Sequence, residues 1–354
     1  LAPLIGARPG EVIITDSVSV NIFSAVAAAL SLNPGRRTML SETGNFPTDL
    51  YMLEGLAHFS SVVVQTGQRF NQDNGTVPSP RSQEPFLCKI VAPAELMAAL
   101  NPEVAVLVLT QVHYKTAEIK DLAAITAAAQ AQGILTVWDL SHSVGSIPVD
   151  LTAANADFAV GCGYKFLNGG PGAPAFLYVA ERHQAAARPV LSGWMGHQDP
   201  FAFTDDYTPA SGIERFRCGT PPILSLTALE AGIEVFAHTD ILSLRAKAIQ
   251  LSQCFISLME QEVGNHGFSL LSPEAAERRG GHLTYHHAQG YGIYQALKAE
   301  GIVSDYRTPG GLRFGITPLY MRFADVFHCV QALKNVVETQ SFDRPEYRQR
   351  AKIT

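Results

Sequence analysis

The chain has 354 residues and a mass of 38.2 kDa, more than one hydrophobic core usually organises, so we expect two domains or one large α/β domain with an appendage. A hydrophobic fraction of 47% and a charged fraction of 16% are typical of a globular enzyme. We expect part of this apolar surface to lie in a subunit interface, which predicts a dimer. The net charge of −6 and a pI near 6.0 give no basic field, which excludes nucleic acid and membrane surfaces as partners.

Cysteine usage and the apolar runs indicate the compartment. The five cysteines are odd in number and scattered without a C-x-x-C pair, so we expect neither a disulfide framework nor a zinc knuckle, but a reducing, cytoplasmic setting. Charged residues, Gly or Pro interrupt each apolar stretch before it reaches the length of a membrane span, and no basic-then-apolar leader opens the chain. Because a strand-like segment begins as early as Glu11, we expect the sequence to lack an N-terminal region.

Apolar runs rich in β-branched residues alternate with helical patterns along the first half of the chain. This alternation predicts a mainly parallel sheet with covering helices, in a large domain that spans residues 1–235. The expected strands are residues 11–15, 37–41, 61–65, 104–110, 135–140, 158–161 and 173–179. Among the helical patterns, residues 17–30 are Ala-rich, and residues 122–132 are amphipathic and stop at Gly133, as a helix tends to.

The remainder predicts a smaller α+β domain, residues 236–354. Two helical patterns cover residues 223–259 around the boundary, which we place near residue 235. The expected later elements are strands at residues 267–271, 282–286, 303–306 and 312–316 and helices at residues 291–300 and 323–337. Residues 68–85 are polar, carry three prolines and show no periodicity, which indicates a surface loop with no assigned chemistry.

A carboxylate, an imidazole and an amine follow two expected strands. Asp139 and His142 end one strand, and Lys165 follows a later one within a segment rich in small residues. Ligand sites in open α/β sheets lie at the carboxyl ends of strands. A lysine there can form an imine with an aldehyde cofactor, because nearby cations and desolvation lower its pKa. Asp139 is the candidate for keeping a pyridine nitrogen protonated.

Each of these features alone has a simpler explanation. A strand-end Asp usually caps a turn, and a lone Lys is usually solvated. The segment from Asp16 to Asn21 predicts a helix start that can hold a phosphate, although Ser17 alone would be an ordinary cap. Together, these features favour a cofactor site over packing.

Two other readings are weaker. His282, His286 and His287 could suggest a metal, but they lie in a strand-like stretch without a further ligand set, so no metal is predicted. Gly161-x-Gly163 lacks the remaining glycines of a dinucleotide fingerprint, and no G-x-x-x-x-G-K-[ST] loop occurs.

Four motifs together resemble the kynureninases, fold-type I pyridoxal-phosphate (PLP) enzymes related to the class V aminotransferases. They are Phe46-Pro-Thr-Asp49, Asp139-Leu-Ser-His142-Ser-Val-Gly145, Gly163-Tyr-Lys165-Phe-Leu-Asn168-Gly-Gly-Pro-Gly172 and Gly310-Gly-Leu-Arg313. The resemblance runs from about residue 11 to residue 338, and its most specific part is the block from Asp139 to Gly172. It implies a fold-type I α/β architecture with a mainly parallel sheet in the large domain and a smaller α+β C-terminal domain. The chain departs from the family in its longer polar stretch and in lacking the usual N-terminal segment.

The resemblance implies a role for each matching residue. Lys165 would carry PLP as a Schiff base, Asp139 would pair with the pyridinium nitrogen, His142 would lie near the phenolic oxygen, and Asp49 would support the nitrogen side. The other implied cofactor positions are Val18, Ser19, Phe46, Thr110, Tyr164, Trp194 and Thr220.

The family also implies a homodimer with shared active sites, because Trp194 and Thr220 correspond to residues that reach across its interface. Arg313 corresponds to the arginine that binds the substrate α-carboxylate, a task suited to a planar bidentate donor. Tyr164 is in addition a candidate proton donor to Cβ, because it adjoins the lysine.

The implied activity is the hydrolytic Cβ–Cγ cleavage of L-kynurenine or 3-hydroxykynurenine in tryptophan catabolism, which yields anthranilate or 3-hydroxyanthranilate and L-alanine. The sequence leaves the choice between the two substrates open. Two alternatives stay open as well: another class V enzyme, either an aminotransferase or a cysteine desulfurase, and a PLP-holding module without turnover. A desulfurase needs a mobile nucleophilic cysteine, and none of the five has a convincing context for that role.

Overall fold

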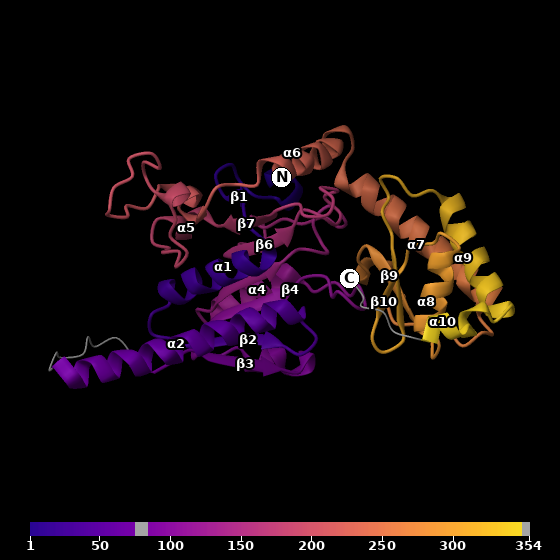
Figure 1. Ribbon diagram of the computed structural model, residues 1–354, viewed down its shortest axis with the longest axis horizontal. Helices are drawn as coiled ribbons and strands as arrows, with labels where there is room; N and C mark the ends of the chain where they lie inside the picture. The colour runs from indigo at the N-terminus through magenta and orange to yellow at the C-terminus, as the bar shows by residue number, and fades with distance from the viewer. Residues whose placement is uncertain (75–83, 349–354) are drawn as a thin grey trace. The chain divides into compact units, whose positions relative to one another are not determined.

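The computed structural model describes the backbone of residues 1–74 and 84–348 and the side chains of residues 1–64 and 84–347. The chain divides into two compact units (Figure 1). The first comprises Leu1–Gln111, Asp121–Val144 and Val149–Val235, and the second comprises Val112–Lys120, Gly145–Pro148 and Phe236–Thr354. Two short segments from the first half of the sequence therefore belong to the second unit. A single boundary near residue 235 assigns these segments to the first domain instead.

A seven-stranded sheet forms the centre of the first unit, with strand order β1-β7-β6-β5-β4-β2-β3 (Figure 1). The strands are β1 (Val12–Ile14), β2 (Thr38–Glu42), β3 (Leu87–Val91), β4 (Val104–Thr110), β5 (Leu135–Asp139), β6 (Phe158–Cys162) and β7 (Ala175–Val179). Strands β3, β2, β4, β5 and β6 are parallel, whereas β7 and β1 run antiparallel to their neighbours. The prediction of a mainly parallel sheet is confirmed. Strands β4, β6 and β7 are buried at every position, which explains their continuous apolar runs.

Two helices of the first unit begin at capping residues. The Ser17 hydroxyl accepts a hydrogen bond from Val20 N (3.4 Å) at the start of α1 (Val18–Leu32), and Asp121 accepts one from Ala124 N (2.9 Å) at the start of α4 (Leu122–Ala131). Small Ala side chains let α1 pack closely across β4, β5, β6 and β7. The other helices of this unit are α2 (Pro47–Asn74), α3 (Leu96–Ala99), α5 (Glu181–Gln184) and α6 (Ile223–Glu234).

One predicted strand is wrong, because residues 61–65 lie within the long helix α2. Ser60 and Ser61 donate hydrogen bonds to carbonyls three residues back, at 2.8 and 2.7 Å, and Val63 is exposed. A short β-branched run can belong to either a strand or a helix, and periodicity alone does not separate the two. Strand β3, which the sequence did not predict, forms the sheet edge instead. The loop predicted at residues 68–85 is helical as far as Asn74, and residues 75–83 lie outside the described residues.

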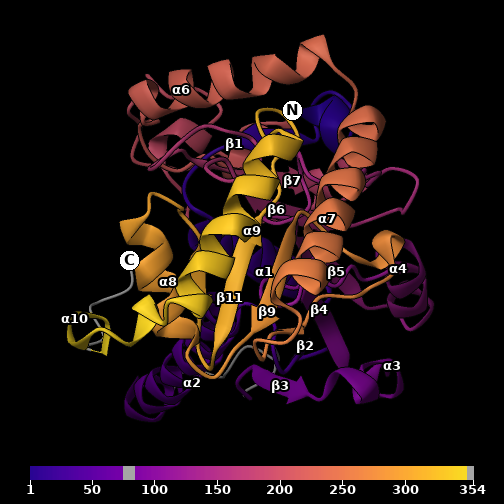
Figure 2. The same ribbon diagram turned by 90° about the vertical axis from the view of Figure 1, so that its right-hand side faces the viewer.

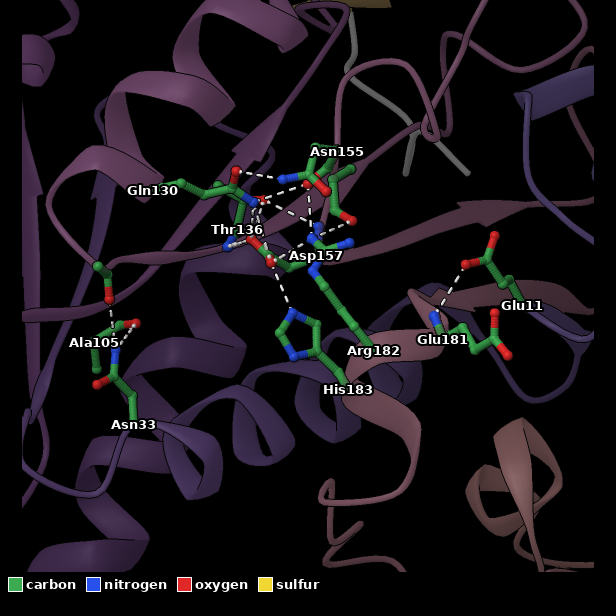
Figure 3. A network of polar contacts seen from close by, with 12 residues as sticks. Glu11, Asn33, Ala105, Gln130, Thr136, Asn155, Asp157, Glu181, Arg182 and His183 are labelled. Carbon is green, nitrogen blue, oxygen red and sulfur yellow. Dashed lines mark hydrogen bonds and ion pairs between the residues drawn. The ribbon is translucent and has the colours of Figure 1, made fainter.

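A buried carboxylate connects several elements at the amino ends of β5 and β6 (Figure 3). Asp157, directly before β6, accepts hydrogen bonds from the Thr136 backbone N (2.9 Å) and hydroxyl (3.0 Å). Arg182 Nη2 and His183 Nε2 each lie 2.8 Å from Asp157 Oδ1, and Gln130 donates to the same carboxylate. Burial by itself would raise the pKa of Asp157, but the hydrogen bonds from His183, Thr136, Gln130 and Arg182 outweigh it and lower that pKa. This network fixes the end of the sheet opposite to the carboxyl ends of the parallel strands.

The second unit is built on an antiparallel sheet with strand order β10-β11-β9-β8. Its strands are β8 (Ser269–Leu270), β9 (His282–His286), β10 (Asp305–Arg307) and β11 (Gly311–Gly315), and its helices are α7 (Ile241–Val263), α8 (Gly290–Ala299), α9 (Phe323–Glu338) and α10 (Pro345–Arg348). Figure 2 shows α7 and α9 side by side over β9 and β11. This arrangement is the smaller α+β architecture expected from the sequence.

Alternate residues of β9 and β11 face opposite sides of that sheet. Leu283, Leu312 and Phe314 are buried in one apolar cluster with residues of α7, α8 and α9. On the other face, Thr284 and Arg313 pair across the strands. The segment Val112–Lys120 contacts this polar face, because the Thr284 hydroxyl donates to the carbonyl of Lys115 (2.5 Å). None of the helices in the described part of the chain combines the length and hydropathy of a membrane span.

Candidate active site

The amine of Lys165 lies beside polar groups at the carboxyl ends of the parallel strands. Lys165 follows β6, and its Nζ is 3.0 Å from His142 Nε2. Asp139 ends β5 and Thr110 ends β4, and the two residues are paired in the sheet register. Because parallel strands end at the same sheet edge, the strand order itself brings these side chains together.

Asp139 is a buried carboxylate held in one orientation. Its side chain is 3% exposed, and the Ser141 backbone N (2.8 Å) and hydroxyl (2.6 Å) both donate to Oδ1. Burial raises the pKa of Asp139, while the charge of Lys165 and the Ser141 hydrogen bonds act in the opposite direction. A fixed buried carboxylate of this kind can hold a proton on a heterocyclic nitrogen.

A second buried carboxylate, Asp49, belongs to the first turn of α2. Its Oδ2 accepts hydrogen bonds from Asn45 Nδ2 (3.1 Å) and the Thr110 hydroxyl (3.4 Å). Burial and then the charge of Asp139 raise the pKa of Asp49 well above its usual value, against the opposing effects of Thr110, Asn45 and Lys165. Asp49 Oδ1 is buried without a hydrogen-bond partner among the described residues. Two buried carboxylates with one unmatched oxygen favour a proton-bearing ligand group at this site.

Aromatic rings flank the lysine. Lys165 Nζ lies 5.8 Å from the ring centroid of Phe46 and 5.7 Å from that of Tyr164, both within cation–π range. Tyr164 is 49% exposed, so its phenol is accessible. The loop that carries Lys165 is packed tightly, because a Cβ on Gly163 would lie 2.4 Å from the carbonyl of Pro174.

A cavity of about 410 Å³ opens beside Tyr164 and the turn that leads into α1. Its lining includes Asp16, Ser17 and residues 219–222, with Thr220 among them. Val18 and Ser19 are the first two residues of α1, where unpaired backbone N–H groups and the positive end of the helix dipole favour an anion.

Of the site residues that the sequence suggested, Tyr164 and Thr220 line this cavity, whereas Trp194 and Arg313 have other surroundings. Trp194 lies in a short 3₁₀ turn, is 38% exposed, and contacts the rings of Phe201 and Phe203. Arg313 lies on β11 in the second unit, where Tyr114 and Asp305 hold its guanidinium.

Comparison with known proteins identifies the family. The family described as "Kynureninase C-terminal domain" matches residues 244–333. Kynureninase from Burkholderia pseudomallei (strain K96243) is 44% identical over 358 residues, which cover 100% of this chain and 81% of that protein. Kynureninase from Pseudomonas fluorescens is 42% identical, with the same coverage.

The chain belongs to the kynureninase family.

The resemblance drawn from the four motifs is therefore confirmed. Solved structures similar to this kynureninase-family chain include the cysteine desulfurase of Thermococcus onnurineus, at 17% identity and a TM-score of 0.73, covering 96% of this chain and 82% of that one. A cystine C-S lyase complex has 17% identity and a TM-score of 0.75, covering 94% and 84%. These likenesses confirm the fold-type I α/β fold class.

The kynureninase motifs indicated the charged residues but not the groups that support them. Ser141 orients Asp139, Asn45 links Asp49 to Thr110, and Gln111 is buried with its backbone N bonded to the carbonyl of Asp139 (3.0 Å). Ser141 lies inside the Asp139 motif and could have been proposed from that position.

The residues present fit PLP. Lys165 offers an amine for the aldehyde, Asp139 a buried carboxylate for the ring nitrogen, and the start of α1 free N–H groups for the phosphate. The unmatched buried oxygen of Asp49 is a further acceptor at the same end of the strands.

Proposed function

We propose that this chain binds PLP through Lys165 and hydrolyses the Cβ–Cγ bond of L-kynurenine or 3-hydroxykynurenine, releasing anthranilate or 3-hydroxyanthranilate and L-alanine. The observation that carries the proposal is the 3.0 Å contact between Lys165 Nζ and His142 Nε2 beside buried Asp139, in a chain 44% identical to a kynureninase along its whole length. Bound PLP supplies an electron-poor ring that accepts the electron pair left when a bond to the substrate α-carbon breaks.

Lys165 has two tasks in this mechanism. Its Nζ would hold the cofactor aldehyde, and once the substrate has bound, its free amine would remove the proton from the substrate Cα. His142 lies within hydrogen-bond distance of Nζ and orients it toward that proton. Lys165 therefore acts as a base only after the substrate has bound.

The two buried carboxylates stabilise positive charge on the ring. Asp139 would hold the proton on the pyridine nitrogen of bound PLP, while the Ser141 hydrogen bonds fix its Oδ1, and Asp49 would support the nitrogen side. A carboxylate kept in place by hydrogen bonds needs no reorganisation during the reaction.

The remaining residues position the cofactor and move a second proton. Val18 and Ser19 would bind the phosphate of PLP through the start of α1, and Phe46 and Thr110 would lie beside its ring. Water adds to the Cγ carbonyl carbon, so its oxygen leaves in the new carboxylate of the aromatic product. Tyr164 donates the proton that Cβ needs to become the methyl group of L-alanine.

We also propose that the chain works as a homodimer with shared sites. Phe201 and Phe203 are 71% and 76% exposed and contact Trp194, and Leu224 near Thr220 is 89% exposed. Exposed aromatic and aliphatic side chains of this kind commonly form the core of subunit interfaces. A second copy that covers them would bring Trp194 and Thr220 to the partner's cofactor.

Complementation tests the shared site. Lys165→Ala and Trp194→Ala chains, each with little activity alone, should regain activity when unfolded together and refolded, because one site of the mixed dimer receives both native residues. If the mixture stays as inactive as its components, Trp194 does not act across the interface. Light scattering on the wild-type chain gives the oligomeric state independently.

One related alternative, a cysteine desulfurase, receives less support. A desulfurase requires a reactive thiolate, whereas Cys162, the cysteine nearest to Lys165 in sequence, is 1% exposed and its pKa is raised by burial.

All five cysteines are free, which supports a reducing cytoplasmic location.

One assay tests the cofactor, the reaction and the lysine together. The chain is incubated with PLP and L-kynurenine while anthranilate fluorescence is followed, and 3-hydroxykynurenine is compared by kcat/KM. Lys165→Ala should abolish product formation, while Lys89→Ala, which changes an exposed lysine on β3, should leave it unchanged. Bound PLP without anthranilate in the wild type would instead support a module without turnover.

A further inference from the structure

Arg313 is held in a fixed position on the polar face of the second sheet. Its side chain is 13% exposed. Nη1 donates a hydrogen bond to the carbonyl of Tyr114 (2.6 Å), and Nη2 donates to Asp305 Oδ2. A guanidinium has five N–H donors, so these two bonds leave three for a ligand.

Asp305 is shared between two arginines. It pairs with Arg313 directly across the strands β10 and β11, and Arg307, two residues along β10, places Nη2 3.0 Å from the same Oδ2. Residues two apart in a strand point to the same face, so Asp305, Arg307 and Arg313 form one cluster. Two cations and one carboxylate leave a net charge of one positive unit, which attracts an anion.

The hairpin between the strands fixes this alignment. Residues 308–310 connect β10 to β11, and Gly310 N donates to the Tyr306 hydroxyl (3.1 Å) inside the fold. Gly310 has a φ of 70°, and a Cβ there would lie 2.7 Å from the His286 ring, so glycine keeps the turn tight. A shift of one residue in the pairing of β10 with β11 would turn the Asp305 side chain to the opposite face of the sheet.

We propose that Asp305 is a positioning residue for Arg313, which it orients so that the remaining guanidinium donors bind the α-carboxylate of the amino-acid substrate. This inference rests on the proposed function and on the role that the resemblance to kynureninases implies for Arg313, which is recognition of that carboxylate. Without Asp305 the guanidinium keeps only the Tyr114 carbonyl and samples other rotamers, so carboxylate binding weakens while the reacting groups of the first unit stay unchanged. Arg307, which contacts the same Asp305 oxygen, helps to hold Asp305 in place.

The test compares wild type, Asp305→Asn, Asp305→Ala and the control Asp325→Asn. Asp325 also pairs with an arginine in the second unit, Arg322, but on the exposed start of α9. With PLP bound, Asp305→Ala should raise KM for L-kynurenine about tenfold or more, as expected for losing a charge-assisted hydrogen bond, with a much smaller change in kcat. Asp305→Asn, which retains one acceptor, should lie between Asp305→Ala and wild type, and the control should match wild type.

Calorimetric titration gives a readout that does not depend on turnover. Asp305→Ala should weaken binding of L-alanine by about the same factor as it raises KM, but leave binding of L-alaninamide, which lacks the carboxylate, unchanged. Equal losses for both ligands, or unchanged KM and L-alanine affinity, would overturn the inference. Absence of anthranilate in the wild type would refute the proposed function instead. If wild type binds L-alanine no better than L-alaninamide, the carboxylate-binding role of Arg313 fails, and the role of Asp305 fails with it.

Discussion

Replacing Asp157 by alanine should destabilise the first unit strongly, although the residue lies at the sheet end opposite to Lys165. The substitution leaves the buried Thr136 N–H without an acceptor, which by itself costs about 1–3 kcal/mol. It also breaks the ion pair with Arg182, and removing one partner of a buried pair costs roughly 3–5 kcal/mol. Because Arg182 is 40% exposed and can be hydrated, its broken ion pair costs less than a fully buried one, and we expect about 3 kcal/mol in total.

Tryptophan fluorescence is the suitable assay. Both tryptophans of the chain, Trp138 and Trp194, lie in the first unit, so their emission reports the unfolding of that unit and not of the second. A loss of about 3 kcal/mol should lower the thermal midpoint by roughly 6–12 °C for a unit of this size. Asp205→Ala, an exposed control in the same unit, should change the free energy of unfolding by no more than about 0.5 kcal/mol. A loss below about 1 kcal/mol for Asp157→Ala would show that the network does not hold the strands together.

Three further predictions concern the same unit. Tyr164→Phe should retain PLP absorbance but lower kcat about a hundredfold, the small end for a proton donor. An unchanged kcat would remove Tyr164 from the mechanism. Ser141→Ala removes one of the two hydrogen bonds to Asp139 Oδ1. The variant should bind PLP about fivefold more weakly in a fluorescence titration, an effect of about 1 kcal/mol. Wild-type PLP affinity would mean that the Ser141 backbone hydrogen bond alone holds Asp139 in place. The lowered pKa of Asp157 gives stability that is complete above the usual carboxyl value of 3.8 and is lost as the pH falls through the lower folded value. Acid titrations monitored by fluorescence should therefore show a steeper loss of stability for wild type than for Asp157→Ala, and parallel curves would contradict this.

The sequence predicted the sheet well where strands are fully buried and poorly where they are not. Runs such as Val104–Thr110 are apolar at each position because both faces of the strand are covered, and such a run is visible in the sequence. The β-branched residues 62–64 lie in a helix instead, where their short apolar run carries no period that would distinguish the two structures.

The same difference applies to the candidate site. Strand ends and motifs indicated Asp139 and Lys165, because chain position determines at which sheet edge they lie. The supporting contacts depend on side-chain geometry: Asn45 joins Asp49 to Thr110 across three elements, and nothing in its sequence position specifies that bridge. The pairing of Asp305 with Arg313 likewise follows from a strand register that composition does not reveal.

The assignment of Val112–Lys120 to the second unit has a consequence for protein engineering. Within that segment the carbonyls of Tyr114, Lys115 and Ala117 accept hydrogen bonds from Arg313, Thr284 and Gly280. A fragment that ends at Val235 would contain these carbonyls without their donors, and the complementary fragment would contain the donors alone. Exchange of C-terminal regions between kynureninase-family members should therefore succeed only when residues 112–120 are transferred together with the part after Val235, as one discontinuous module.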